Sequence, residues 1–193
     1  MTAFSRVPTR TFLFIALALL ALQATVLSLM GQPLLALAAP FKLWAGNPLG
    51  PDNSQQLTDW YSFSHVIHGF IFYGLLKLAA PRLPFAARLL IAMGVEISWE
   101  FLENSPFVIE AYRKQALAAG YRGDSVINSL SDTAMMSLGF FLASRLPWWV
   151  VLLAAVVMEA TTIILIRDGL ILNILNFAVT WPALEHWQQA WKP

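Results

Sequence analysis

The sequence contains no cysteine, which excludes disulfide bonds, iron–sulfur clusters and thiolate-bound metals. It also has little charge, since only 12% of its 193 residues are Asp, Glu, Lys or Arg and the formal net charge is +1. Such a balance provides no excess of positive charge for a nucleic-acid partner, and we expect none. Internal repeats, low-complexity tracts and any segment typical of a soluble domain are also missing.

What remains is mostly hydrocarbon, because hydrophobic residues make up 58% of the chain. This composition predicts a membrane protein whose partners are membrane lipids. A chain of this length allows one small bundle of spanning helices. We therefore expect an all-α, polytopic transmembrane bundle that forms a single integral membrane domain over residues 1–193.

Five apolar segments are long enough to cross a hydrocarbon core that requires about 20 residues. They are Thr11–Gly31, Asp59–Ala80, Phe85–Asn104, Asp124–Ser144 and Trp148–Ile166. The first exceeds the roughly 7–15 apolar residues of a signal peptide and is read as a retained span. Leu170–Trp181 is shorter and is expected to be a thin sixth span or an interfacial helix, so we predict five or six spans.

Two loops separate the early spans. Gln32–Thr58 is rich in Pro, Gly and Asn, and its apolar part Leu34–Trp44 is expected to lie at the interface or to re-enter the membrane. Phe107–Gly123 is expected to contain a short amphipathic helix over Glu110–Leu117.

Basic residues gather on one side of the predicted bundle. Arg6 and Arg10 precede the first span, and Lys77, Arg82 and Arg88 surround the turn between the second and third. The positive-inside rule therefore predicts a cytoplasmic N-terminus and a cytoplasmic turn at Lys77–Arg88.

Three consecutive spans each carry one stripe of polar residues. Residues three or four apart share a helix face, and this spacing applies within each of the sets His65/His68, Glu96/Glu100/Glu103 and Asp124/Asn128/Asp132. Ionisable groups are costly in lipid, so the stripes should face inward. At about 1.5 Å per residue, the inner members of all three sets lie roughly 5–12 Å from the same membrane side. The sequence predicts a polar cavity open to the extracytoplasmic face.

This set predicts a candidate site with two kinds of role. The expected catalytic residues are His65, His68, Glu96, Glu100 and Asp132, and the expected substrate-binding residues are Glu103, Asn104, Asp124 and Asn128. So many carboxylates need compensation by protons, by arginines 113, 122 or 167, or by a metal ion. Zinc or another divalent ion held by His65, His68 and Glu100 is one alternative, and a metal-free hydrogen-bonded network is the other.

Some acidic residues have structural explanations. Asp124 before Ser125 suits a helix N-cap. Glu110, Glu185 and Asp168 are expected to be solvated, and Glu159 is expected to pair only loosely with Arg167. Glu96→Gln is expected to fold at least as well as the native chain, because a buried carboxylate costs stability.

Three sequence blocks carry a resemblance to a known family. The blocks Asp59–Phe70, Glu96–Ser105 and Tyr121–Asp132 resemble an uncharacterised family of small bacterial multipass inner-membrane proteins. More distantly, the order His, Glu, Asp-x-x-x-Asn-x-x-x-Asp is similar to VanZ-like membrane proteins. The resemblance implies a location in the bacterial inner membrane and a role in the cell envelope.

Three functions are compatible with these features. One is an intramembrane hydrolase or transferase, metal-dependent or not, that acts on a lipid or lipid-linked substrate at the outer leaflet. Another is a proton- or cation-coupled transporter, which would need a polar path on the cytoplasmic side as well. The third is a non-catalytic membrane assembly protein.

Overall fold

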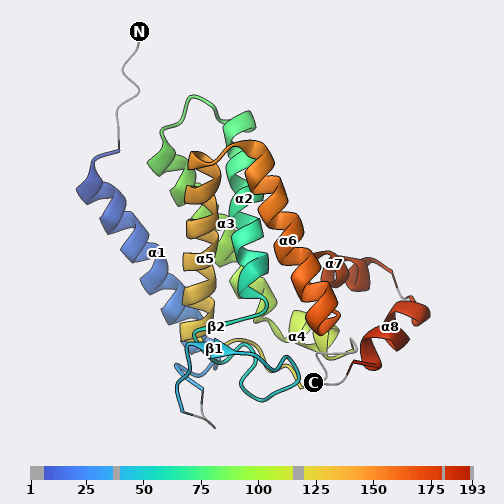
Figure 1. Ribbon diagram of the computed structural model, residues 1–193. Helices are drawn as coiled ribbons and strands as arrows, with labels where there is room; N and C mark the ends of the chain where they lie inside the picture. The colour runs from blue at the N-terminus through green and yellow to red at the C-terminus, as the bar shows by residue number, and fades with distance from the viewer. Residues whose placement is uncertain (1–6, 37–39, 115–119, 180, 192–193) are drawn as a thin grey trace.

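The computed structural model describes residues 7–36, 40–114, 120–179 and 181–191, and the regular secondary structure within these ranges is almost entirely helical (Figure 1). The elements in chain order are α1 (Thr9–Leu29), β1 (Trp44–Ala45), β2 (Thr58–Asp59), α2 (Ser62–Ala79), α3 (Phe85–Glu103), α4 (Pro106–Arg113), α5 (Val126–Arg145), α6 (Trp148–Ile166), α7 (Leu170–Ala178) and α8 (Pro182–Gln189). The two short strands pair in parallel. The predicted all-α class is confirmed.

Three of the described helices, α1, α5 and α6, are long and apolar enough to cross a membrane. The prediction of five or six spans is corrected to this number. The helices α2 and α3 have 18 and 19 residues, but they carry the histidines and glutamates of the polar stripes. Helix α7 has nine residues and is therefore about 14 Å long, too short for the thin sixth span.

The remaining segment predictions have mixed outcomes. The amphipathic helix of the second loop is α4, which begins at Pro106, before the predicted start at Glu110. Residues 115–117 at its predicted end lie outside the described residues, as does Arg6. In Leu34–Trp44, the described residues 34–36 and 40–43 form no helix, and residues 37–39 lie outside the description.

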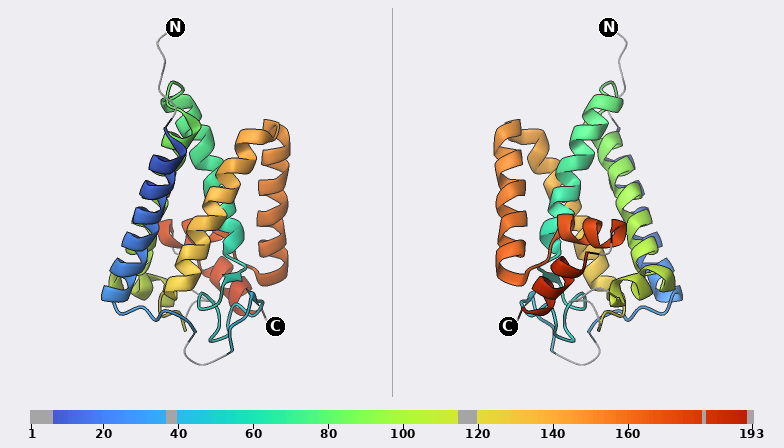
Figure 2. Two further views of the ribbon diagram at one scale, coloured as in Figure 1. Left: turned by 90° about the vertical axis from the view of Figure 1, so that its left-hand side faces the viewer. Right: turned by 90° about the vertical axis from the view of Figure 1, so that its right-hand side faces the viewer.

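The five long helices lie side by side, with α2, α3 and α5 placed between α1 and α6 (Figure 1). The N-terminal end of α1 and the α2–α3 and α5–α6 turns share one end of the bundle. The loop that contains β1 and β2, together with α4 and α8, lies at the other end. Figure 2 shows α7 running across the long helices rather than along them.

Helices α2 and α5 approach closely where each has a glycine. A Cβ on Gly69 would overlap the carbonyl oxygen of Met136, and one on Gly139 would overlap the carbonyl oxygen of Val66. Small residues at a crossing let two backbones come together, as is common between membrane helices. This crossing sets the positions of His65 on α2 and Asp132 on α5.

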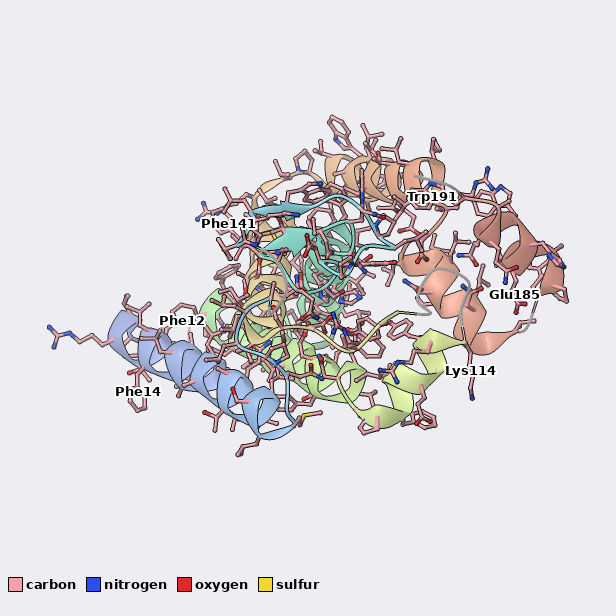
Figure 3. The ribbon with its side chains drawn as sticks, turned by 90° about the horizontal axis from the view of Figure 1, so that it is seen from below. Phe12, Phe14, Lys114, Phe141, Glu185 and Trp191 are labelled. Carbon is pink, nitrogen blue, oxygen red and sulfur yellow. The ribbon has the colours of Figure 1, made fainter. Side chains whose placement is uncertain are left out.

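The outer faces of the bundle are apolar. Phe14 on α1 is 74% exposed and Ile164 on α6 is 74% exposed. Figure 3, which looks along the long helices, shows Phe14 and Phe141 at the periphery of the bundle. An exposed apolar belt of this kind suits contact with lipid.

Candidate functional site

The three polar stripes meet at His65. Its Nδ1 lies 2.5 Å from Glu96 Oε1 and 3.7 Å from Glu100 Oε1, and its Nε2 lies 3.8 Å from Asp132 Oδ2. All four side chains are buried. Helices α2, α3 and α5 therefore each contribute to one cluster, and both ring nitrogens of His65 face carboxylates.

Glu96 is shared between the two histidines. His68 Nδ1 lies 3.2 Å from Glu96 Oε2, and the two imidazole rings are 5.2 Å apart in an edge-to-face arrangement. A carboxylate that receives a hydrogen bond from a histidine fixes the orientation and tautomer of that ring. Glu96 thus orients both imidazoles.

Glu100 is held on one side only. Its Oε2 accepts a hydrogen bond from Ser129 Oγ at 2.6 Å, whereas its Oε1 has no hydrogen-bond partner among the described residues. Gln23 of α1 donates to Ser129 Oγ at 2.8 Å and accepts from Thr133 Oγ1 at 3.0 Å. Our sequence reasoning missed Gln23, although a lone glutamine within an apolar span is a recognisable signal.

The predicted substrate-binding residues Asn104 and Asp124 bond to each other. Asn104 Nδ2 donates to Asp124 Oδ2 at 2.7 Å, and the Asp124 amide donates to Asn104 Oδ1 at 2.7 Å. Burial raises the pKa of Asp124 to about 6, against the hydrogen bonds from Asn104 and Tyr121 that lower it. The N-cap of α5 is Ser125, whose Oγ accepts from the Asn128 amide, so the N-cap prediction for Asp124 is wrong.

Asn128 and Glu103 differ in how free their side chains are. The side-chain amide of Asn128 donates through Nδ2 to the backbone carbonyl of Gln56 at 3.0 Å and so connects α5 to the long loop. Glu103 at the end of α3 is only half-buried and lines both cavities described below. Two of the four predicted substrate-binding residues have a carboxylate, and that of Glu103 is more accessible than that of the buried Asp124.

Two acidic residues near the α6–α7 turn are buried rather than loosely placed. Asp168, predicted to be solvated, is 4% exposed and accepts a hydrogen bond from Tyr61 Oη at 2.7 Å. Glu159 accepts from the amides of Leu170 at 3.2 Å and Ile171 at 2.7 Å. It therefore caps the first turn of α7 instead of pairing with Arg167. These contacts fix α7 beside the site.

Asp168 predicts a pH-dependent stability. Burial raises the pKa of its carboxyl from 3.8 to about 6, despite hydrogen bonds from Tyr61 and Gly169 that lower it. The folded state then binds this proton more tightly than the unfolded chain, so the free energy of unfolding falls as the pH rises from about 4 to about 6, by about 3 kcal/mol. We expect Asp168→Asn to lose this part of the dependence in thermal unfolding of the detergent-solubilised protein. Identical pH profiles for the two proteins would contradict it.

Two cavities open beside the cluster. A polar one of about 240 Å³ lies among the long loop, the start of α5 and the α6–α7 turn, and Asp59, Asp124 and Asp132 line it. An apolar one of about 300 Å³ lies among α2, α3 and α7. The lining residues that both cavities share are Tyr61, His65, Glu103, Tyr112 and Asn173. His65 therefore lies where a polar space meets an apolar one.

No Lys or Arg compensates the clustered carboxylates within the described part of the chain. Among the described residues, the ion pair that forms without a histidine joins Lys42 to Asp52, away from the cluster. Arg113 donates to the Tyr121 carbonyl and Arg167 to the Trp187 carbonyl, so neither serves the predicted role. Arg122 lines the polar cavity.

The grouping of metal-binding atoms differs from the predicted set His65, His68 and Glu100. In the described residues, the atoms that lie within 4.8 Å of one another belong to His65, His68 and Glu96, or to His65, Glu100 and Glu103. The rotation of α3 turns Glu96 toward both histidines, and Glu100 reaches only His65.

These features define an all-helical protein with candidate membrane spans and a buried histidine–carboxylate site. The chain belongs to the family described as "Protein of unknown function (DUF2585)", whose model matches residues 27–190. It is 47% identical over 179 residues to a UPF0314 protein of Sphingopyxis alaskensis, covering 93% of this chain and 95% of the relative. It is 46% identical over 186 residues to the UPF0314 protein RHE_CH03951 of Rhizobium etli, covering 95% of this chain and 94% of the relative.

The predicted membership of an uncharacterised bacterial family is confirmed by these matches. The more distant likeness to VanZ-like proteins stays a prediction. No solved structure matches the chain.

Proposed function

We propose that this protein is an inner-membrane hydrolase or transferase that acts on a lipid or lipid-linked envelope substrate at the outer leaflet. The observation that carries the proposal is the position of His65 at the junction of the polar and apolar cavities. An amphipathic substrate could place its head group in the polar cavity and its hydrocarbon chain against Phe72, Ile174 and Phe177 of the apolar one. The bond between them would then lie beside the histidine.

The proposed placement in the membrane puts α2 and α3 at the same depth as α1, α5 and α6, which they pack against (Figure 1). Their charged groups are turned into the bundle rather than toward lipid. The ends that carry Lys77, Arg88 and Arg145 would be cytoplasmic by the positive-inside rule. The polar cavity, at the other end of the bundle, would then open to the extracytoplasmic side.

In this proposal His65 is the general base. Its imidazole takes a proton from water or from an acceptor hydroxyl as the oxygen attacks the substrate. The carboxylates around the ring stabilise the imidazolium that forms, and Glu96 holds the orientation of His65 and His68. Glu103, which lines both cavities, is the group placed to donate a proton to the leaving oxygen.

The transporter alternative requires a polar path through the other half of the bundle. There the described helices are sealed by buried apolar side chains, including Met93, Met136 and Phe140. This cluster begins one turn beyond Asp132 on α5, and the polar residues of the site do not continue through it. Access from one side only favours an enzyme over a carrier.

The test compares membrane lipids of cells that lack the protein with those of cells that express the native chain or His65→Gln. We expect the native chain to change the abundance of one lipid class and its product, and His65→Gln to reduce that conversion by at least about 100-fold, the usual contribution of a general base. Glu110→Gln on the exposed face of α4 is the matched control and should retain full conversion. Equal lipid profiles for native and His65→Gln proteins at equal expression would refute the proposal.

A further inference from the structure

Glu100 carries an unexplained feature of the site. Its side chain is buried, one oxygen accepts a hydrogen bond from Ser129, and the other has no hydrogen-bond partner among the described residues. A buried polar atom without a partner costs about 1–3 kcal/mol. A proton on this oxygen would need an acceptor, but the nearest nitrogen, His65 Nδ1 at 3.7 Å, is already engaged with Glu96.

A cation would satisfy this oxygen, because it binds the lone pair directly. Glu100 belongs to a group with His65 and Glu103 in which one ligand atom from each residue lies within 4.8 Å of the others. Two ligands that are each about 2.1 Å from zinc lie about 3.4 Å apart at a tetrahedral angle. The 3.7 Å between His65 Nδ1 and Glu100 Oε1 is close to this separation, and an ion there would replace the proton that joins His65 Nδ1 to Glu96.

The surroundings of the group are also suited to a dication. Several carboxylates crowd one histidine, and the described residues place no Lys or Arg nitrogen within 4.0 Å of them. Asp132, whose Oδ2 lies 3.8 Å from the other ring nitrogen Nε2, is placed as a carboxylate behind a metal-bound histidine is. Glu103 lines both cavities, so a position on the ion would remain open to water or substrate.

We propose that His65, Glu100 and Glu103 bind one divalent transition-metal ion of the type of Zn²⁺ or Mn²⁺. One imidazole nitrogen with carboxylate oxygens, and no thiolate, is the donor set that such ions accept. Mg²⁺ and Ca²⁺ prefer oxygen donors alone and bind more weakly here. The site goes beyond the proposed function, because with the ion bound His65 and Glu103 would be metal ligands instead of base and acid, and a metal-bound water would be the nucleophile. Binding of the ion does not depend on that reaction.

The test is a Zn²⁺ titration of the full chain, purified in detergent and stripped with a chelator, with the bound metal counted by elemental analysis. We expect one ion per chain, and at least about ten-fold weaker binding for Glu100→Gln and for Glu103→Gln. Glu110→Gln and His186→Asn, both on exposed positions, are the controls and should bind as the native chain does. Mg²⁺ should not compete at equal concentration.

The outcomes separate the metal site from the proposed reaction. Folded native protein that binds no stoichiometric Zn²⁺, or a Glu103→Gln variant that binds as tightly as the native chain, overturns the site. Because Glu103 is half-buried at the cavity, this variant decides the matter even if Glu100→Gln does not fold. Zn²⁺ binding with no lipid conversion would refute the reaction alone, and lipid conversion by a native chain that binds no Zn²⁺ would refute the site alone.

Discussion

Gly69→Ala is expected to lower the free energy of unfolding by about 3 kcal/mol or more, and Gly139→Ala should do the same. At both positions the added methyl group would overlap a backbone carbonyl of the facing helix, which cannot move aside as a flexible side chain can. The strain would separate α2 from α5 and displace His65, which lies one turn before Gly69. Thermal or denaturant unfolding in detergent measures the effect.

Two other helical glycines of the bundle are matched controls. Gly74 on α2 and Gly94 on α3 have no atom within 4 Å of an added Cβ. Alanine has a higher helix propensity than glycine by about 1 kcal/mol, so Gly74→Ala and Gly94→Ala should leave stability unchanged or raise it. The contrast in sign distinguishes packing from propensity. If all four variants were equally stable, the close crossing of α2 and α5 would be wrong.

Glu96→Leu is expected to cost about 3–5 kcal/mol, the usual loss when one partner of a buried ionic pair is removed. Glu96 is fully buried and contacts both His65 at 2.5 Å and His68 at 3.2 Å. Leucine of similar size would leave two imidazoles without this acceptor. Unfolding measurements should show the loss, and nitrogen chemical shifts of the two rings should change together.

Glu110→Leu, at an exposed position on α4, is the control and should change stability by no more than about 0.5 kcal/mol. Glu96→Gln should fall between the two, because its amide oxygen still accepts one hydrogen bond. From the sequence alone we expected Glu96→Gln to fold at least as well as the native chain; from the contacts of Glu96 with both histidines we now expect a loss of stability. A Glu96→Leu variant as stable as the native protein would show that the histidines do not depend on Glu96.

The positions of the helices were predictable because they depend on local sequence. Four of the five long apolar segments both begin and end within two residues of the observed helices, and the fifth, Asp59–Ala80, begins three residues before α2. Proline marks several of these boundaries; α3, for example, starts at Phe85 after Pro84. The grouping of His65, Glu96, Glu100 and Asp132 was also predictable, since helical spacing and depth bring them level. The functional roles of these residues are tested by the experiments above.

Several site residues could not be read from local patterns. Asp168 occupies a turn that looks solvated in the sequence, yet it is buried and accepts a hydrogen bond from Tyr61. Glu159 lies within α6, yet it caps α7 instead of pairing with Arg167. The number of apolar spans was overestimated because α2 and α3 were counted by length, although their polar residues lower their apolar character.

The sequence by itself determined which segments are helical and which faces of α2, α3 and α5 are polar, because the 3.6-residue period and the cost of charge in lipid act within a single helix. Only the tertiary structure decided that Glu96 binds both histidines while Glu100 keeps an unpartnered oxygen. That choice depends on the rotation and separation of neighbouring helices. The rotation and separation of α2 and α5 are set by close backbone contact at Gly69 and Gly139. These two glycines are 70 positions apart in the chain, and local periodicity carries no information over such a separation in sequence.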